Sequence, residues 1–148
     1  IIAYSFELWY NSYEIIESVL ILIIYIKKEK NIMDLQKEMF EKLTQNSSLI
    51  DLQDYFASIF SIRGFNNEKT SDKMLMLIEE VGELAKALRK SEKRIAIDYE
   101  RIKEYESVES ELADVFIVLL SVCINENVNL MEAVLKKEEV NINRLWKI

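Results

Sequence analysis

The chain has 148 residues, of which 50% are hydrophobic and 30% charged, and it contains two glycines and no proline. This length is enough for one domain with a hydrophobic core, and the scarcity of helix breakers favours long helices over a sheet with tight turns. The net charge of −7 and the lack of a basic stripe argue against a nucleic-acid groove. It leaves room for a free nucleotide whose charge a bound metal would offset.

Histidine is absent and Cys123 is the single cysteine, which limits the possible catalytic groups and metal ligands. Imidazole catalysis and zinc sites built from histidine or several cysteines are excluded, and no intrachain disulfide can form. Cys123 lies between Val122 and Ile124 and is predicted to be an inert core thiol in a cytoplasmic protein. Carboxylates remain as metal ligands, and they favour Mg²⁺, with Mn²⁺ as the alternative.

Residues 1–32 differ from the rest of the chain. Their apolar run, VLILIIYI at 19–26, is shorter than the roughly 20 residues that a membrane helix needs, and no basic segment precedes it as in a signal peptide. We predict that 1–32 is an atypical N-terminal extension, translated from sequence upstream of a natural start at Met33. The alternative is a helix that packs on the domain or on a partner subunit. Residues 33–148 are predicted to form a single helical domain.

The first predicted elements after Met33 are a short amphipathic segment and a well-delimited helix. The amphipathic segment covers about 34–43. Ser47 or Ser48 is expected to cap the next helix, and Gly64 to end it, since serine is a favoured N-cap and glycine readily adopts the left-handed conformation that follows a helix.

Three further helices are predicted, over about residues 72–90, 107–126 and 129–146. Thr70 or Ser71 is expected to cap the first of them, and Asn129 with Glu132 resembles a capping box at the start of the last. The charged stretch between the first two is either a loop or an exposed helix. The sequence therefore predicts an all-α domain of four to five helices.

Two of these helices carry paired carboxylates, in the segments EEVGE (79–83) and ELAD (111–114). Glu80 and Glu83 share one helix face, and so do Glu111 and Asp114, because residues three apart lie on the same side of a helix. Both pairs border an apolar face, so antiparallel packing of the two helices would bring them together. Four carboxylates in a partly dehydrated position repel one another, and a hard divalent cation relieves that repulsion.

Solvated salt bridges are the alternative explanation of such pairs, for example between Glu83 and Lys86. The second pair argues against it, because no lysine or arginine occurs between Lys103 and Lys136. We therefore favour a metal site. Glu79 is expected to be an exposed helix residue, with outer-shell metal binding or orientation of water as its alternative role.

The ordered combination of E-x-x-E and E-x-x-D resembles the MazG-like branch of the all-α nucleoside triphosphate pyrophosphohydrolases. The segments IRGF (62–65) and LIEEVGELAKALRK (77–90) are similar to that family's sequences, and the resemblance covers about 49–146. In the last predicted helix, KEEVNINR matches the family pattern K-x-x-x-N-x-x-R through Lys137, Asn141 and Arg144.

The resemblance implies Mg²⁺-dependent hydrolysis of a nucleoside triphosphate to the monophosphate and pyrophosphate, with a role in cleaning the nucleotide pool. It implies that the catalytic, metal-binding residues are Glu80, Glu83, Glu111 and Asp114. Substrate binding is implied for Lys137, Asn141 and Arg144. Family members are homodimers or homotetramers with the site near an interface, so helix-mediated oligomers are expected here, without nucleic-acid or membrane partners.

Two other functions stay open. Phosphoribosyl-ATP pyrophosphohydrolases share the fold and the acidic pattern, and a non-catalytic helical interaction module would use the apolar stripes for assembly. A membrane-associated protein is a weaker option that rests on residues 15–26 alone. Base recognition is not specified by the sequence: four aromatic residues could stack on a base but at helical spacing are more often core, namely Tyr55, Phe56, Phe65 and Trp146.

Overall fold

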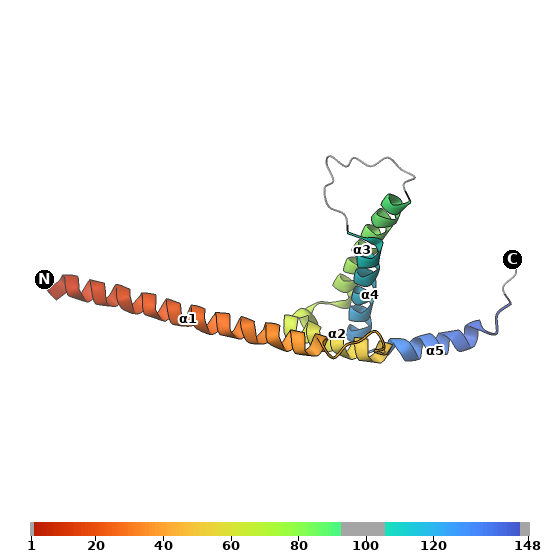
Figure 1. The fold of residues 1–148 in the computed structure, drawn as a ribbon, viewed down its shortest axis with the longest axis horizontal. Helices are drawn as coiled ribbons and strands as arrows, with labels where there is room; N and C mark the ends of the chain where they lie inside the picture. Colours follow the sequence, from red (N-terminus) through yellow and green to blue (C-terminus); the bar gives the residue numbers. More distant parts are fainter. Residues whose placement is uncertain (1, 93–105, 146–148) are drawn as a thin grey trace. The chain divides into compact units, whose positions relative to one another are not determined.

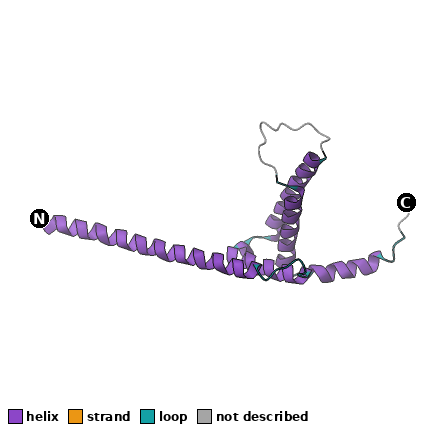
Figure 2. Ribbon diagram, viewed as in Figure 1, coloured by secondary structure: helices purple, strands orange, loops and turns teal. Residues whose placement is uncertain are grey.

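The computed structural model describes residues 2–92 and 106–145, with side chains from residue 18 onward, and these ranges contain helices and no strand (Figures 1 and 2). The elements in chain order are α1 (Ile2–Phe40), α2 (Leu49–Arg63), the 3₁₀ helix η1 (Phe65–Asn67), α3 (Thr70–Ser91), α4 (Val108–Asn125) and α5 (Leu130–Asn141). The predicted all-α fold is confirmed. Most of the charged stretch between α3 and α4, and Trp146, lie outside the described residues.

The chain divides into two compact units, Ile1–Thr44 and Gln45–Ile148. The first unit is formed by α1, a 39-residue helix that continues without a break through Met33. The amphipathic segment predicted at about 34–43 is not separate from it, because most of that segment forms the last turns of α1. From Val19 to Ile26 its apolar side chains are exposed. No helix in the described part of the chain combines the length and apolarity that crossing a membrane requires. The extension predicted for 1–32 stays a prediction.

In the second unit, α2 begins and ends where the sequence predicts. The hydroxyl of Ser48 accepts a hydrogen bond from the backbone N–H of Asp51 (3.1 Å), and the carboxylate of Asp51 accepts one from the backbone N–H of Ser48 (2.7 Å). This reciprocal capping box satisfies two donors that the first helical turn leaves unpaired. At the other end, Gly64 adopts a left-handed conformation with φ of 81° and donates to the carbonyls of Phe60 and Ser61.

The start of α3 differs from the prediction. Its N-cap is Lys69, which makes no side-chain capping bond. Thr70 and Ser71, the two predicted caps, both lie inside the helix, and the hydroxyl of Thr70 donates to Glu126 at the end of α4 (2.5 Å). Thr70 is therefore the first residue of α3, and its hydroxyl forms a tertiary contact with the end of α4.

A buried lysine fixes the first turns of α3. The ammonium of Lys73 donates to Glu68 (2.8 Å) and to the carbonyl of Phe65 (3.3 Å), and it lies 5.7 Å from the ring centroid of Phe60. Asn125 of α4 donates to the carbonyl of Glu68 (2.9 Å). These contacts join α2, η1, α3 and α4 at one end of the α3–α4 pair and thereby help to set its register.

The core of this unit forms where α2 and α3 pack against α4. Its buried apolar members are Ile59, Phe60, Ala87, Val118, Leu120 and Cys123. Burial raises the pKa of the Cys123 thiol, in keeping with the inert core role predicted for it.

Side-chain caps also begin α4 and α5. Ser107 accepts from the backbone N–H of Ser110 (3.2 Å) and Asn129 from that of Glu132 (3.0 Å). The carboxylate of Glu132 pairs with Lys136 (2.6 Å). The last helix ends at Asn141, earlier than the predicted end near Trp146, so Arg144 lies beyond it.

Candidate metal and active site

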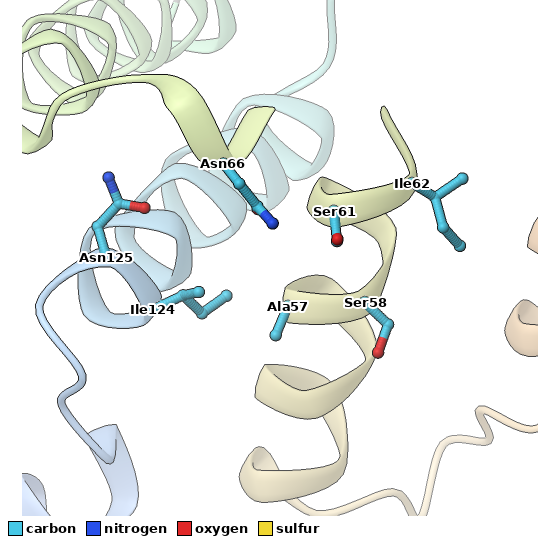
Figure 3. A pocket seen from close by; sticks show the side chains of 7 residues that line it. All are labelled: Ala57, Ser58, Ser61, Ile62, Asn66, Ile124 and Asn125. Carbon is cyan, nitrogen blue, oxygen red and sulfur yellow. The ribbon is translucent and has the colours of Figure 1, made fainter. Parts of the chain in front are cut away.

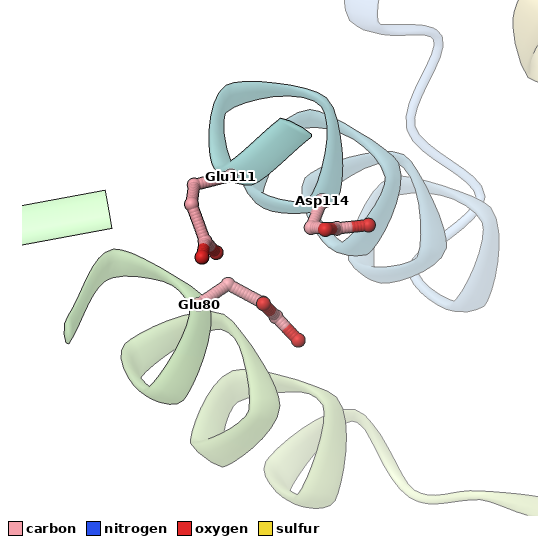
Figure 4. A group of neighbouring side chains, drawn as sticks. All are labelled: Glu80, Glu111 and Asp114. Atoms are coloured by element: carbon pink, nitrogen blue, oxygen red, sulfur yellow. The ribbon is translucent and has the colours of Figure 1, made fainter. Parts of the chain in front are cut away.

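Antiparallel packing of α3 and α4 brings acidic side chains from the two helices together, as Figures 1 and 4 show. Glu80 comes from α3, and Glu111 and Asp114 come from the first two turns of α4. One carboxylate oxygen from each of the three lies within 4.8 Å of the others. We call these three residues the acidic triad. Glu111 is buried, with 6% of its surface exposed, and the other two are half-buried.

The triad gathers negative charge from two helices. Burial, followed by the charges of Asp114 and Glu111, raises the pKa of Glu80. Burial, followed by the charges of Glu106 and Glu83, raises the pKa of Glu111, with Lys86 opposing the shift. Both carboxyl groups therefore hold a proton more readily than an isolated glutamate does.

The donor chemistry of the triad fits a hard divalent ion. Within residues 18–92 and 106–145, none of its three carboxylates forms an ion pair with lysine or arginine. Three carboxylate oxygens can share one Mg²⁺ or Mn²⁺ and leave coordination positions for water or phosphate. The residues present therefore suit the metal that the sequence implies.

Glu83, the fourth predicted ligand, lies at the edge of the triad. Its side chain is 47% exposed and its carboxylate pairs with Lys86 (2.7 Å). It is near enough for its charge to raise the pKa of Glu80 and Glu111. The structure thus gathers three of the four predicted ligands and gives Glu83 the salt bridge that the alternative explanation foresees. Glu79 is exposed, as expected.

The predicted substrate-binding residues lie on and after α5, away from the triad. Figure 1 shows α5 following the C-terminal end of α4, whereas the triad uses the N-terminal turns of α4. Lys137 and Arg144 are exposed, and the Asn141 amide donates to Glu138 (3.1 Å). A single subunit does not bring these three residues to the carboxylates.

An open cavity of about 670 Å³ lies between α2, η1 and the C-terminal end of α4, at the other end of α4 from the triad (Figure 3). Uncharged side chains line it: Ala57, Ser58, Ser61, Ile62, Asn66, Ile124 and Asn125. The sequence analysis missed this set, because no spacing links residues that only tertiary packing brings together.

Three of the four aromatic residues considered for base stacking make ring contacts in a series that includes Phe60; the fourth, Trp146, lies outside the described residues. Tyr55 meets Phe56 edge-on at 5.1 Å between ring centroids, Phe56 stacks on Phe60 at 5.6 Å, and Phe60 lies 6.2 Å from Phe65. The contacts run from α2 to η1 and favour the packing role over base recognition.

Comparison with known families is consistent with this geometry. The model of the MazG nucleotide pyrophosphohydrolase domain matches residues 68–144, which is more than half of the chain and includes all of α3, α4 and α5. No curated protein and no solved structure matches the chain. The chain belongs to the MazG nucleotide pyrophosphohydrolase domain family.

Proposed function

We propose that this protein hydrolyses a nucleoside triphosphate to the monophosphate and pyrophosphate with the help of Mg²⁺ held by Glu80, Glu111 and Asp114. The observation that supports this most directly is the acidic triad, which comes from two helices inside the matched family domain and has no ion-pair partner among the described residues. Mn²⁺ would fit the same oxygen ligands. Nucleotide-pool cleaning in the cytoplasm is the cellular role that the family resemblance suggests.

The three carboxylates would hold the ion, and Glu83, which lies at the edge of the triad, would supply a fourth oxygen ligand in place of its ion pair with Lys86. When bound, Mg²⁺ would neutralise phosphate charge, lower the pKa of bound water and stabilise the leaving pyrophosphate. The buried position of Glu111 suits a ligand, because the low dielectric strengthens its attraction to a cation.

Lys137, Asn141 and Arg144 are proposed to bind the phosphates or sugar of the substrate. Their distance from the triad within one subunit supports an oligomeric enzyme, a homodimer or homotetramer, in which assembly completes the substrate site. Lysine and arginine are suitable partners for phosphate oxygens. The substrate is a free nucleotide, and no nucleic acid or membrane partner is proposed.

The test is product analysis with a panel of canonical and modified NTPs and dNTPs, together with phosphoribosyl-ATP. Release of pyrophosphate and monophosphate from the triphosphates, dependent on Mg²⁺, is expected. Release from phosphoribosyl-ATP alone would identify the alternative enzyme. No release from any compound by folded protein would contradict catalysis and favour a helical interaction module.

A further inference from the structure

Lys86 places a positive charge at the edge of the acidic triad. Its ammonium donates to the carboxylate of Glu83 (2.7 Å), which lies one turn earlier on the same face of α3. Its charge also acts across the helix pair on Glu111 of α4, where it lowers the pKa against the raising effects of burial and neighbouring carboxylates. Among the described residues, Lys86 is the cation with such an influence on the triad.

The pair of Lys86 and Glu83 differs from the buried ion pair of the same unit. Lys73 is held by Glu68 and by the carbonyl of Phe65, and 4% of its side chain is exposed. The side chains of Lys86 and Glu83 are 42% and 47% exposed. An ion pair between half-exposed side chains adds little to stability, because water solvates both charges when they separate. Lys86 can therefore change its partner at small cost, whereas Lys73 cannot.

A metal ion at the triad would compete with Lys86 for the carboxylate of Glu83. That carboxylate lies beside the triad, since its charge raises the pKa of both Glu80 and Glu111. A divalent cation held there would attract the same oxygens that Lys86 now binds. In the protein without nucleotide, Lys86 thus opposes the use of Glu83 as a metal ligand.

The nucleotide would supply a new anionic partner for Lys86. A triphosphate chain that binds the metal comes to the face of α3 on which Lys86 lies. The lysine ammonium, on a flexible stem, suits phosphate oxygens as a compact point charge. Lys137 and Arg144 lie on and after α5, away from the triad within one subunit. Lys86, in contrast, is a cation that the subunit itself brings to the carboxylates.

We propose that Lys86 exchanges partners when substrate binds: it pairs with Glu83 in the metal-free protein, and with a phosphate oxygen of the nucleotide once Glu83 has turned to the metal. The inference rests on the proposed function, because it assigns a further substrate-binding residue to the same site. It also makes Lys86 a link between the two ligands, since Lys86 opposes binding of Mg²⁺ alone and favours binding of phosphate together with Mg²⁺.

Lys86→Met tests the exchange through binding, without relying on turnover. Calorimetric titration with Mg²⁺ alone should show about two- to fivefold tighter binding than in the unsubstituted protein, because the competitor for Glu83 is gone. Titration with inorganic triphosphate at saturating Mg²⁺ should show about tenfold weaker binding, because a charge-assisted contact to phosphate is lost. Lys86→Arg keeps the charge and should stay close to the unsubstituted protein in both titrations.

Two comparisons separate partner exchange from the simple loss of a positive charge. Lys69→Met makes the same substitution at the N-cap of α3, about 16 Å along the helix from Glu80, and should change neither affinity. In Glu83→Gln protein, the added Lys86→Met change should no longer tighten Mg²⁺ binding, because the carboxylate for which Lys86 competes is absent. It should still weaken the binding of triphosphate. Thermal unfolding confirms that each variant is folded.

Three results would overturn the exchange: Mg²⁺ binding by Lys86→Met protein that is equal or weaker, triphosphate binding that is equal, or tightening of Mg²⁺ binding that persists in full in Glu83→Gln protein. The last result would reflect long-range charge alone. When the unsubstituted protein binds Mg²⁺ and triphosphate and releases pyrophosphate from a nucleotide, these results contradict only the role of Lys86. Unsubstituted protein that binds neither Mg²⁺ nor triphosphate would contradict the proposed function itself, and this inference with it.

Discussion

At the scale of single residues, the acidic triad combines repulsion with availability for a metal. Glu80, Glu111 and Asp114 approach one another without an ion-pair partner in the described residues, and burial, followed by neighbouring negative charges, raises the pKa of Glu80 and Glu111. Repulsion among the three carboxylates destabilises the metal-free subunit, and a bound divalent cation would relieve it.

Glu80→Gln is expected to stabilise the metal-free protein at neutral pH, because it removes one of three repelling charges while keeping the side-chain shape. It should also weaken stabilisation by Mg²⁺ and lower pyrophosphate release by about 10²–10³-fold. Thermal unfolding with and without Mg²⁺ measures the first two effects. Glu79→Gln, on the same helix but exposed, is the matched control and should change all three quantities much less, because its charge is one of the smaller contributions to the raised pKa of Glu80.

The stability of the metal-free protein should also depend on the protonation of Glu80 and Glu111. Folding raises the pKa of Glu80 and Glu111 above the ordinary value of 4.5, so in the interval above 4.5 the folded protein holds more protons than the unfolded chain. The contribution of these two groups is thus fully present below 4.5, and it is lost as pH rises through their folded pKa values.

Asp51, Glu109 and Glu132 have lowered pKa values and act in the opposite sense. The comparison therefore needs the Glu80→Gln, Glu111→Gln double variant, which retains those three groups. Denaturation of both metal-free proteins from pH 4 to pH 7 should show the double variant gaining stability relative to the unsubstituted protein as pH rises. A constant difference would contradict the assignment of the raised pKa values.

The triad also shows which site residues could be predicted from the sequence. Helical spacing identifies Glu80, Glu111 and Asp114, because the side of a helix on which a residue lies follows from its position. The carboxylate of Glu83 can either pair with Lys86 or join the triad, because it lies close to both. Spacing alone does not decide between them.

At the scale of elements, local sequence signals predict both ends of α2 correctly, but they misplace the start of α3 and the end of α5. The Ser48 capping box and the left-handed Gly64 involve neighbours in sequence, so the sequence predicts them. The Thr70 hydroxyl bonds to Glu126, far away in sequence. The end of α5 at Asn141 has no glycine or proline to mark it. Tertiary contacts and unmarked ends account for the two errors.

Gly64→Ala is expected to destabilise the second unit by about 1–2 kcal/mol, the cost of placing a Cβ in the left-handed conformation. No atom within 4 Å would oppose the methyl group, so the cost should be conformational alone. Gly64→Asn is the control and should cost less, since asparagine tolerates this conformation better. Urea denaturation measures both variants, and equal stability of the alanine variant would contradict this account of the helix end.

At the scale of the whole molecule, the second unit contains the matched domain, the triad and the cavity, whereas α1 forms a unit of its own. The all-α class and the acidic constellation could be predicted from periodicity and spacing. The division at Gln45 could not, because α1 continues through Met33 without a local break. The cavity could not either, because α2, η1 and α4 contribute residues that share no sequence pattern.

The division into units has a testable consequence for activity. If residues 1–32 are dispensable, protein beginning at Met33 should keep Mg²⁺-dependent pyrophosphate release and thermal stability close to those of the full chain. The comparison is made at equal subunit concentration. Loss of both properties would show that the N-terminal part of α1 contributes to folding or assembly.

The most direct test of the central claim is a Mg²⁺ titration of pyrophosphate release by the unsubstituted protein, Asp114→Asn and the Glu79→Gln control, with the best nucleotide of the panel. The account predicts no release without Mg²⁺, saturable activation in the unsubstituted and control proteins, and loss of most activity in folded Asp114→Asn protein. Metal-independent release, or an Asp114→Asn protein as active as the control at every Mg²⁺ concentration, would contradict a metal site at the triad.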